Sequence, residues 1–256
     1  MIKDELIKSF LEYLSSKDIQ QLQDFKDSEF LQLQDINEEK LLQQLYTISK
    51  FHKRVMGYKG YMGQRLENKT GSVVEQYKVN IRRLKRYIKN IRINTASSDF
   101  ERSLLKEGYG YLQRAEKCII EAFNAGYIDI IERSMKRTEI CLGLTDFNNL
   151  RSKGNSIEFI NLNKCCYNNI EMDCYNLLSK YRRKGIKLDY RKLASKFCEY
   201  EGLDENSCTF ILALLSYPYG FMKSCNRYRE RTKEWSEEAY KDNLLKEMIK
   251  DGEMLI

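Results

Sequence analysis

Proline is almost absent from this chain, because Pro218 is the only one in 256 residues. Proline interrupts helices, since it lacks a backbone N–H and clashes with the preceding turn. A chain with so little proline can form long, uninterrupted helices. Apolar residues also recur at spacings of three and four along most of the chain, which is the period of one buried helix face. The sequence therefore predicts a mainly α-helical protein.

The apolar spacing also locates the individual helices. One helix is expected to begin after Asp35 or Asn37, either of which can cap it, and to end at Gly57. Pro218 is expected to open a later helix, where its missing N–H leaves no bond unmade. That helix is expected over 219–230, and the others over 72–92, 99–125, 170–184, 189–200, 204–215 and 236–251.

The helical pattern stops between residues 139 and 165. The stretch 139–144 is short and apolar, and 156–162 alternates in part between apolar and polar residues. Lys153-Gly154-Asn155 lies between them and has the composition of a turn. These features predict a small two-stranded β-ribbon near 140–162 as the main β element of the fold.

Composition and charge exclude several classes of protein. The chain is 42% hydrophobic with a net charge of +7, so it can bury a core and is not expected to be disordered. It has no apolar run of 18 residues, so no membrane span is predicted. The first residues mix charges and lack the pattern of a signal peptide. We therefore expect a protein that is not secreted by a signal peptide, and its oligomeric state stays open.

The positive charge is concentrated in one expected helix. Its basic residues interleave with apolar ones, as in any amphipathic surface helix, so a solvated face is the favoured interpretation. A nucleic acid or other polyanion is the less favoured partner. The basic residues of this run are Lys78, Arg82, Arg83, Lys85, Arg86, Lys89 and Arg92.

Neither the cysteines nor the histidine predict a metal site. The eight cysteines form no CxxC pair, and His52 is the only histidine, whereas zinc sites need paired ligands at short spacing. Reduced cysteines that pack as small apolar residues are the favoured interpretation. We expect His52 to be structural, and we expect neither a metal nor a cofactor.

The segment from Ile140 to Leu150, which reads ICLGLTDFNNL, resembles the catalytic loop of aminoglycoside-phosphotransferase-like kinases. The resemblance is closest to the branch of the spore coat protein CotS. That branch has Cys-His-Gly-Asp, then four residues, then Asn. Its next strand ends in Asp-Phe-Asp after a glycine turn, where this chain has Gly154 followed by Asn161-Leu162-Asn163.

Further segments resemble the family in the same order. Phe51-His52 followed by Gly57-Tyr58 is similar to the Phe-His helix of the family, and Asp173 stands where the family has an Asp at the start of a helix. The resemblance covers about residues 38–250 and implies a kinase-like fold. Its C-terminal part rests on Tyr217-Pro218-Tyr219, Asn226-Arg227-Tyr228 and Lys233-Glu234-Trp235.

The departures from the family pattern concern the groups that phosphoryl transfer needs. Leu142 stands at the family's His, Leu144 at its catalytic Asp and Asn161 at its metal-binding Asp. Leucine cannot orient a hydroxyl or accept its proton, and magnesium prefers carboxylates. The resemblance therefore implies a degenerate site with no catalytic residue. Its positions are Leu142, Leu144, Asn149, Asn161, Asn163 and Asp173.

A second register of the loop stays open. Asp146-Phe147 can stand for the family's Asp-Phe, which places Arg151 at the loop Asn and Leu144 at the His. Asp146 would then be the base of an active small-molecule phosphotransferase with a rearranged site, and Asp173 would lie near its metal.

The nucleotide-covering lobe of the family is largely missing from this chain. In the family, a sheet with a phosphate-covering loop and a strand Lys precedes the Phe-His helix. Here only about 40 residues precede it, and the first glycine is Gly57. We expect residues 1–36 to be an N-terminal remnant, helical or loop, and residues 37–256 to form the helical C-terminal lobe of a kinase-like domain.

The resemblance and the departures together predict a pseudokinase of the spore coat type. Its expected role is structural or interactive in the assembly of a bacterial spore coat, with other coat proteins as partners. Its expected location is the mother-cell cytoplasm and then the coat. The alternatives are the active phosphotransferase and a helical nucleic-acid-binding protein that uses the basic run.

Overall fold

The computed structural model describes residues 2–25, 33–60 and 66–256, and describes residues 2–8 by their backbone only. Within the predicted N-terminal remnant, residues 1 and 26–32 therefore lie outside the described part. The prediction of a mainly helical protein is confirmed. The helices are α1 Ile2–Ser15, α2 Glu38–Val55, α3 Ser72–Asn94, α4 Asp99–Asn124, α5 Tyr127–Arg137, α6 Glu171–Arg183, α7 Tyr190–Glu201, α8 Glu205–Ser216, α9 Tyr219–Glu230 and α10 Glu237–Lys250.

Local signals in the sequence explain where several helices begin and end. The Asn37 side chain accepts a hydrogen bond from the backbone N–H of Lys40 and so caps α2. Ser98 caps α4 in the same way, and Pro218 precedes the first residue of α9. Gly57 follows α2 with a φ of +85°, a conformation that favours glycine.

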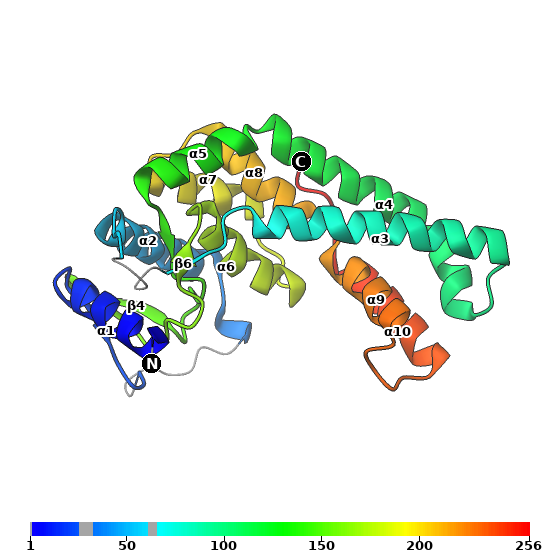
Figure 1. Cartoon of the computed structure of the whole chain (residues 1–256), viewed down its shortest axis with the longest axis horizontal. Helices are drawn as coiled ribbons and strands as arrows, with labels where there is room; N and C mark the ends of the chain where they lie inside the picture. Colours follow the sequence, from blue (N-terminus) through cyan, green and yellow to red (C-terminus); the bar gives the residue numbers. More distant parts are fainter. Residues whose placement is uncertain (1, 26–32, 61–65) are drawn as a thin grey trace.

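The helices form a body with two projecting pairs (Figure 1). In the body, α2 packs on α7, and α6 and α7 pack on α8. The long helices α3 and α4 run side by side and extend away from the body, and α9 and α10 form a second pair against them. One continuous apolar core connects residues from Phe10 of α1 to Leu244 of α10. Within the described residues, no helix has the length and apolar character that crossing a bilayer requires.

The predicted ribbon exists, but its first arm was assigned to the wrong residues. The hairpin joins β4 Leu150–Lys153 to β5 Ser156–Phe159 in antiparallel register, with Gly154 in the turn. Arg151 and Glu158 face each other across the hairpin and form an ion pair at 2.6 Å. The predicted arm at 139–144 lies elsewhere, because β3 Ile140–Cys141 pairs with β6 Cys166–Tyr167.

The β structure is larger than a two-stranded ribbon. β1, Ile19–Gln21, adds to β5 in parallel and makes a three-stranded sheet in the order β1-β5-β4. β2, Glu67–Asn68, adds to β6 and makes a second sheet in the order β2-β6-β3. Such strands of two or three residues carry too little alternation to be recognised from the sequence.

The helix α5 was not predicted. Gly126, with a φ of +71°, separates it from α4, whereas the sequence favoured one helix that ends at Ala125. α5 buries only Tyr127, Ile130 and Ser134. Its apolar face is narrow, and the sequence analysis assigned no helix to residues 127–137.

Candidate functional site

The loop that resembles a kinase catalytic loop connects β3 to β4. Gly143 turns the chain there with a φ of +75°, and a Cβ at this position would lie 2.5 Å from the carbonyl oxygen of Lys164. Only glycine fits so close to another backbone. The turn holds the segment after β3 tightly against the segment that leads into β6.

Asp173, in the first turn of α6, anchors this loop. Its carboxylate accepts hydrogen bonds from the backbone N–H of Leu142 at 2.7 Å and from that of Gly143 at 2.8 Å. Oδ2 of Asp173 also lies 3.0 Å from Nε2 of His52. Asp173 is fully buried, so its charge is compensated by these neighbours rather than by water.

His52 links three helices through this contact. Its Nδ1 lies 2.7 Å from Oε1 of Glu201 at the end of α7, and its Nε2 contacts Asp173 of α6. Burial lowers the pKa of His52, but the Glu201 charge and the hydrogen bonds to both carboxylates outweigh it and raise that pKa to about 10. His52 is therefore an imidazolium held between two buried carboxylates, with both ring nitrogens engaged. A free ring nitrogen, which a general base needs, is absent.

The same neighbourhood contains the one group of side chains, among the described residues, whose spacing suits a metal ion. The ligand atoms of His52, Cys141 and Asp173 all lie within 4.8 Å of one another. The sulfur of Cys141 contacts the carbonyl of Asn169 at 3.2 Å, and burial raises the pKa of this thiol well above its ordinary value. A neutral thiol is a poor ligand for zinc, so these three residues are better suited to a hydrogen-bonded network.

Three of the predicted asparagines meet at the far end of the loop. Asn149 donates to the carbonyls of Leu144 at 2.7 Å and Asn161 at 3.0 Å, and its side-chain oxygen accepts from the N–H of Asn161. The side-chain oxygen of Asn161 accepts from the N–H of Asn163 at 2.6 Å. These amides therefore tie the loop to the chain after β5.

The two leucines of the loop differ in burial. Leu142 has no exposed surface, whereas Leu144 is half-buried. The structure thus brings Leu142, Leu144, Asn149, Asn161 and Asp173 together around one loop, with Asn163 next to Asn161.

Asp146, the base of the alternative register, is engaged elsewhere. Its Oδ2 lies 2.7 Å from Nζ of Lys180, and its Oδ1 accepts from the N–H of Asn148 at 3.0 Å. It lines a small cavity of about 50 Å³ together with Lys184 of the loop after α6. Arg151, the loop Asn position of that register, pairs with Glu158.

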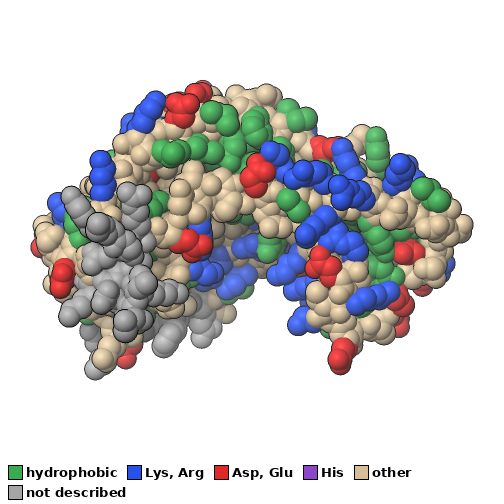
Figure 2. Space-filling model, in the orientation of Figure 1, with side chains coloured by type: hydrophobic (Ala, Val, Ile, Leu, Met, Phe, Trp, Pro, Cys, Tyr) green, Lys and Arg blue, Asp and Glu red, His purple; other side chains and the backbone are tan. Residues whose placement is uncertain are grey.

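The basic run lies on α3 and faces solvent. All seven side chains are exposed except Lys78, which is half-buried. Lys78 pairs with Glu75 at 2.8 Å, Arg83 with Glu230 at 3.6 Å, and Lys85 with Glu116. Figure 2 shows these blue side chains along α3, above a hollow between the body and the α9–α10 pair.

Sequence reasoning missed a buried ion cluster next to the site. Arg133 of α5 contacts Glu139 at 3.0 Å and Glu171 at 2.8 Å, and Ser207 of α8 donates to Glu171 at 2.8 Å. Glu171 is fully buried and Glu139 nearly so. The one available signal was Glu139, a charged residue directly before the apolar stretch 140–144.

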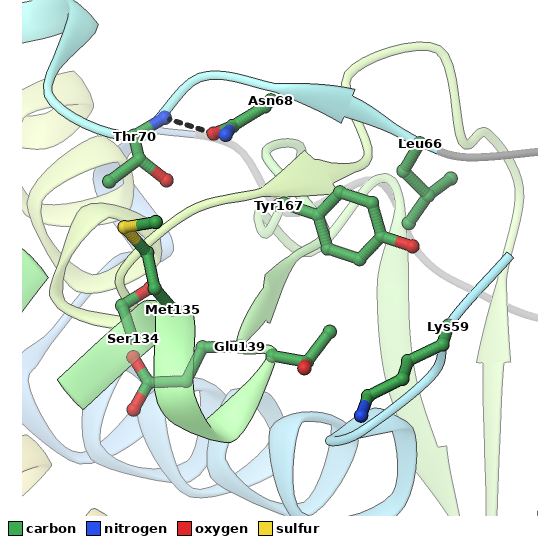
Figure 3. A pocket seen from close by; sticks show the side chains of 9 residues that line it. Lys59, Leu66, Asn68, Thr70, Ser134, Met135, Glu139 and Tyr167 are labelled. Carbon is green, nitrogen blue, oxygen red and sulfur yellow. Dashed lines mark hydrogen bonds between the residues drawn. The ribbon is translucent and has the colours of Figure 1, made fainter. Parts of the chain in front are cut away.

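A cavity of about 330 Å³ lies beside this cluster, between the end of α5 and the second sheet (Figure 3). Tyr167 and Leu66 face it from one side, and Met135 and Glu139 from another, with Lys59 at its edge. The carboxylate of Glu139 is held by Arg133. None of the six predicted site positions lines this cavity.

The comparisons with known proteins identify the class of fold. No family model matches the chain, and no curated protein matches it by sequence. Among solved structures, the chain is similar to the aminoglycoside phosphotransferase from Alicyclobacillus acidocaldarius subsp. acidocaldarius DSM 446, with a TM-score of 0.64 and 14% identity. The match covers 83% of this chain and 63% of that one. The fold is therefore similar to the kinase-like fold of an aminoglycoside phosphotransferase, and the chain spans less than two thirds of that structure's length.

Proposed function

We propose that this protein is a pseudokinase with a structural or interactive role in the assembly of a bacterial spore coat. The fold similarity supports a kinase-like architecture. The proposal adds that the described helices represent the C-terminal lobe, that the site is degenerate and that the protein acts through its surfaces. A fold alone implies no activity, so the argument depends on the loop.

The observation that carries the proposal is the position of Leu144. The loop turns at Gly143, Asp173 binds the two amides directly before Leu144, and Asn149 binds its carbonyl. These contacts support the alignment that we propose, in which Leu144 stands at the family's catalytic Asp. A side chain that cannot accept a proton then occupies the place where the attacking hydroxyl must be oriented.

The surrounding polar groups add to this argument. The Asn161 side-chain oxygen, at the position of the metal-binding Asp, accepts from the N–H of Asn163. Asp146, the carboxylate that is closest in sequence to Leu144, is paired with Lys180. Both groups would have to leave present partners to serve a nucleotide and its magnesium.

The coat role rests on the resemblance of the sequence to the CotS branch. Other coat proteins are the proposed partners, and the proposed route is from the mother-cell cytoplasm to the spore. A fluorescent fusion expressed in the sporulating host tests this part. We expect a ring at the spore surface, whereas a signal that stays diffuse in the mother cell throughout sporulation would contradict the role.

The loop itself is tested by restoring the family residues. We expect Leu142→His with Leu144→Asp to lower the free energy of unfolding by about 1–3 kcal/mol or more, because the histidine enters a fully buried position without a partner. We also expect no ATP turnover from this variant. Unchanged stability together with a gain of turnover would show that only two side chains separate the chain from an active enzyme.

A further inference from the structure

A groove lies between the start of α3, the second half of α6 and the start of α9, and is defined here as the Arg183 groove. Its volume is about 390 Å³, which lies in the range of small-molecule sites. Gln76, Asn176, Ser179 and Arg183 supply its polar lining. Figure 2 shows Lys and Arg side chains on both sides of a hollow between the body and the α9–α10 pair.

The charge of the groove is positive. Among the described residues that line it, none is acidic. The Arg183 guanidinium lies over the Tyr219 ring at 4.7 Å, and Nζ of Lys223 lies 5.6 Å from the same ring. Two cations from different helices thus meet at one tyrosine. Among the described residues, the only hydrogen-bond partner of Arg183 is Ser179, at a long 3.4 Å, so most of its donors remain available for a ligand.

A small pocket of about 20 Å³ continues the groove inward and shares Tyr175, Ser179, Arg183 and Tyr219 with it. Nη1 of Arg182, which lines this pocket, is buried and has no hydrogen-bond partner within the described residues. Burial and the nearby charge of Arg114 lower the pKa of Arg182. The carboxylate of Asp251 also lines this pocket. It is already engaged, because it accepts hydrogen bonds from the N–H groups of Gly220 and Phe221 at 2.8 Å each.

Two tyrosines in the wall of the groove are buried and already hydrogen-bonded. Tyr77 and Tyr175 are buried and their hydroxyls bond to each other, and the Tyr77 ring stacks on Tyr217 with 3.5 Å between centroids. Because these rings are covered, they offer no exposed face on which the bases of a single-stranded nucleic acid could stack. The concave shape and the volume favour a small ligand.

We propose that the Arg183 groove binds a small phosphorylated polyol, such as a sugar phosphate. The phosphate group would lie against Arg183, because guanidinium groups bind phosphate oxygens in pairs. Lys223, which does not line the groove but lies near the Tyr219 ring, would add a second positive charge at its margin. The hydroxyl groups would meet the amide of Asn176 and the side-chain oxygens of Gln76 and Ser179. The Nε2 of Gln76 donates to Asn80, and the Ser179 hydroxyl donates to the carbonyl of Asn176, so these two oxygens would act as acceptors. The proposal is independent of whether the kinase-like loop is degenerate, because none of these residues belongs to that loop.

Calorimetric titration of the full chain at low salt tests this site. The probes are glucose 6-phosphate, glucose and inorganic phosphate. We expect saturable binding of glucose 6-phosphate with one site per chain, weaker binding of phosphate and none of glucose. No saturable binding of glucose 6-phosphate at millimolar concentration would overturn the proposal, and equal affinity for phosphate would overturn its polyol part.

Arg183→Gln and Arg82→Gln, which remove the same charge at two different places, provide the main comparison. Arg183→Gln should weaken glucose 6-phosphate binding by about tenfold or more, and Arg183→Lys should weaken it less because the charge is kept. Arg82→Gln, an exposed change on α3 outside the groove, should leave it within about twofold. Melting temperatures of the three variants without ligand establish that each is folded.

A single-stranded oligothymidine provides the competing outcome. If the oligonucleotide binds more tightly than glucose 6-phosphate, and Arg82→Gln weakens it as much as Arg183→Gln does, the basic surface is a general polyanion site. That result would overturn the proposal of a small-molecule groove.

Discussion

Asp173 and His52 show how a single carboxylate can organise a loop. Asp173 holds two consecutive backbone amides and one imidazole, and the residues Asp173, Leu142 and His52 are buried. Removing one partner of such a buried ion pair costs about 3–5 kcal/mol, because the other charge is left uncompensated. The sequence singled out both residues by resemblance, but it contained nothing that paired them, because 121 positions separate them.

The charge state of His52 can be observed directly, because it is the only histidine in the chain. Its pKa is raised to about 10 in the folded protein, so its imidazole resonances should stay at their protonated positions from pH 6 to pH 9 in an NMR titration. A titration midpoint near the ordinary value of about 6.5 would contradict the ion triad.

The raised pKa of His52 also makes the stability of the fold depend on pH. The pKa of His52 is higher in the folded than in the unfolded chain. The contribution of protonated His52 to the free energy of unfolding is therefore fully present below about pH 6.5 and is lost as the pH rises toward 10. The difference in free energy of unfolding between the protein and His52→Asn should therefore shrink from pH 6 to pH 10. Urea unfolding at several pH values measures it, and a constant or growing difference would contradict this sign.

The two loop leucines form a second test at the residue scale. Leu142→Ala should cost about 2–5 kcal/mol of unfolding free energy, as for a fully buried leucine. Leu144→Ala should cost clearly less, because Leu144 is half-buried. Denaturant unfolding of the two variants compares them. Equal costs would show that the loop packs differently from the arrangement described here.

At the scale of elements, α1 and β1 join the N-terminal segment to the body. Phe10, Leu14 and Ile19 are buried, and β1 lengthens the β4–β5 hairpin by one strand. The prediction for residues 1–36 allowed helix or loop and did not include a strand. Three residues cannot show an alternating pattern, and their partner β5 lies more than 130 positions away, so only tertiary structure could reveal the pairing.

Docking of β1 is tested by two neighbours in one strand. Ile19→Ala should cost about 2–5 kcal/mol, since Ile19 is almost fully buried. Gln20→Ala should change the stability by less than about 0.5 kcal/mol, because Gln20 is exposed. Thermal or urea unfolding provides both values. If both variants are neutral, the N-terminal segment does not pack on the body.

The elements also show what periodicity can and cannot supply. The long helices α2, α3 and α4 were predicted within a few residues, because each buries a regular stripe and α2 and α4 carry clear caps at Asn37 and Ser98. The first arm of the ribbon was misplaced because its apolar residues Ile140 and Leu142 are buried by contacts to β6 and α6, not by a hairpin. A short apolar segment has the same sequence pattern whether it is one arm of a hairpin or is buried by other elements.

At the scale of the whole molecule, the positively charged side chains gather around a hollow in the surface. The net charge is +7, and Figure 2 shows Lys and Arg side chains around the hollow beside α3. The sequence located the basic run on α3 but not the groove, because the groove combines residues from three helices that lie far apart in the sequence. Lys223, which lies beside the groove near the Tyr219 ring, comes from α9, about 40 positions after Arg183, and no local pattern links them.

The measurement that tests the central proposal most directly is phosphoryl transfer by the purified protein. ATP and Mg²⁺ are supplied with aminoglycosides, sugars or choline as acceptors, and the protein is compared with Asp146→Ala. We predict that both show only the background rate, because Leu144 cannot serve as a base and Asp146 is paired with Lys180. Turnover above background that Asp146→Ala abolishes would contradict the pseudokinase proposal and establish the alternative register of the loop.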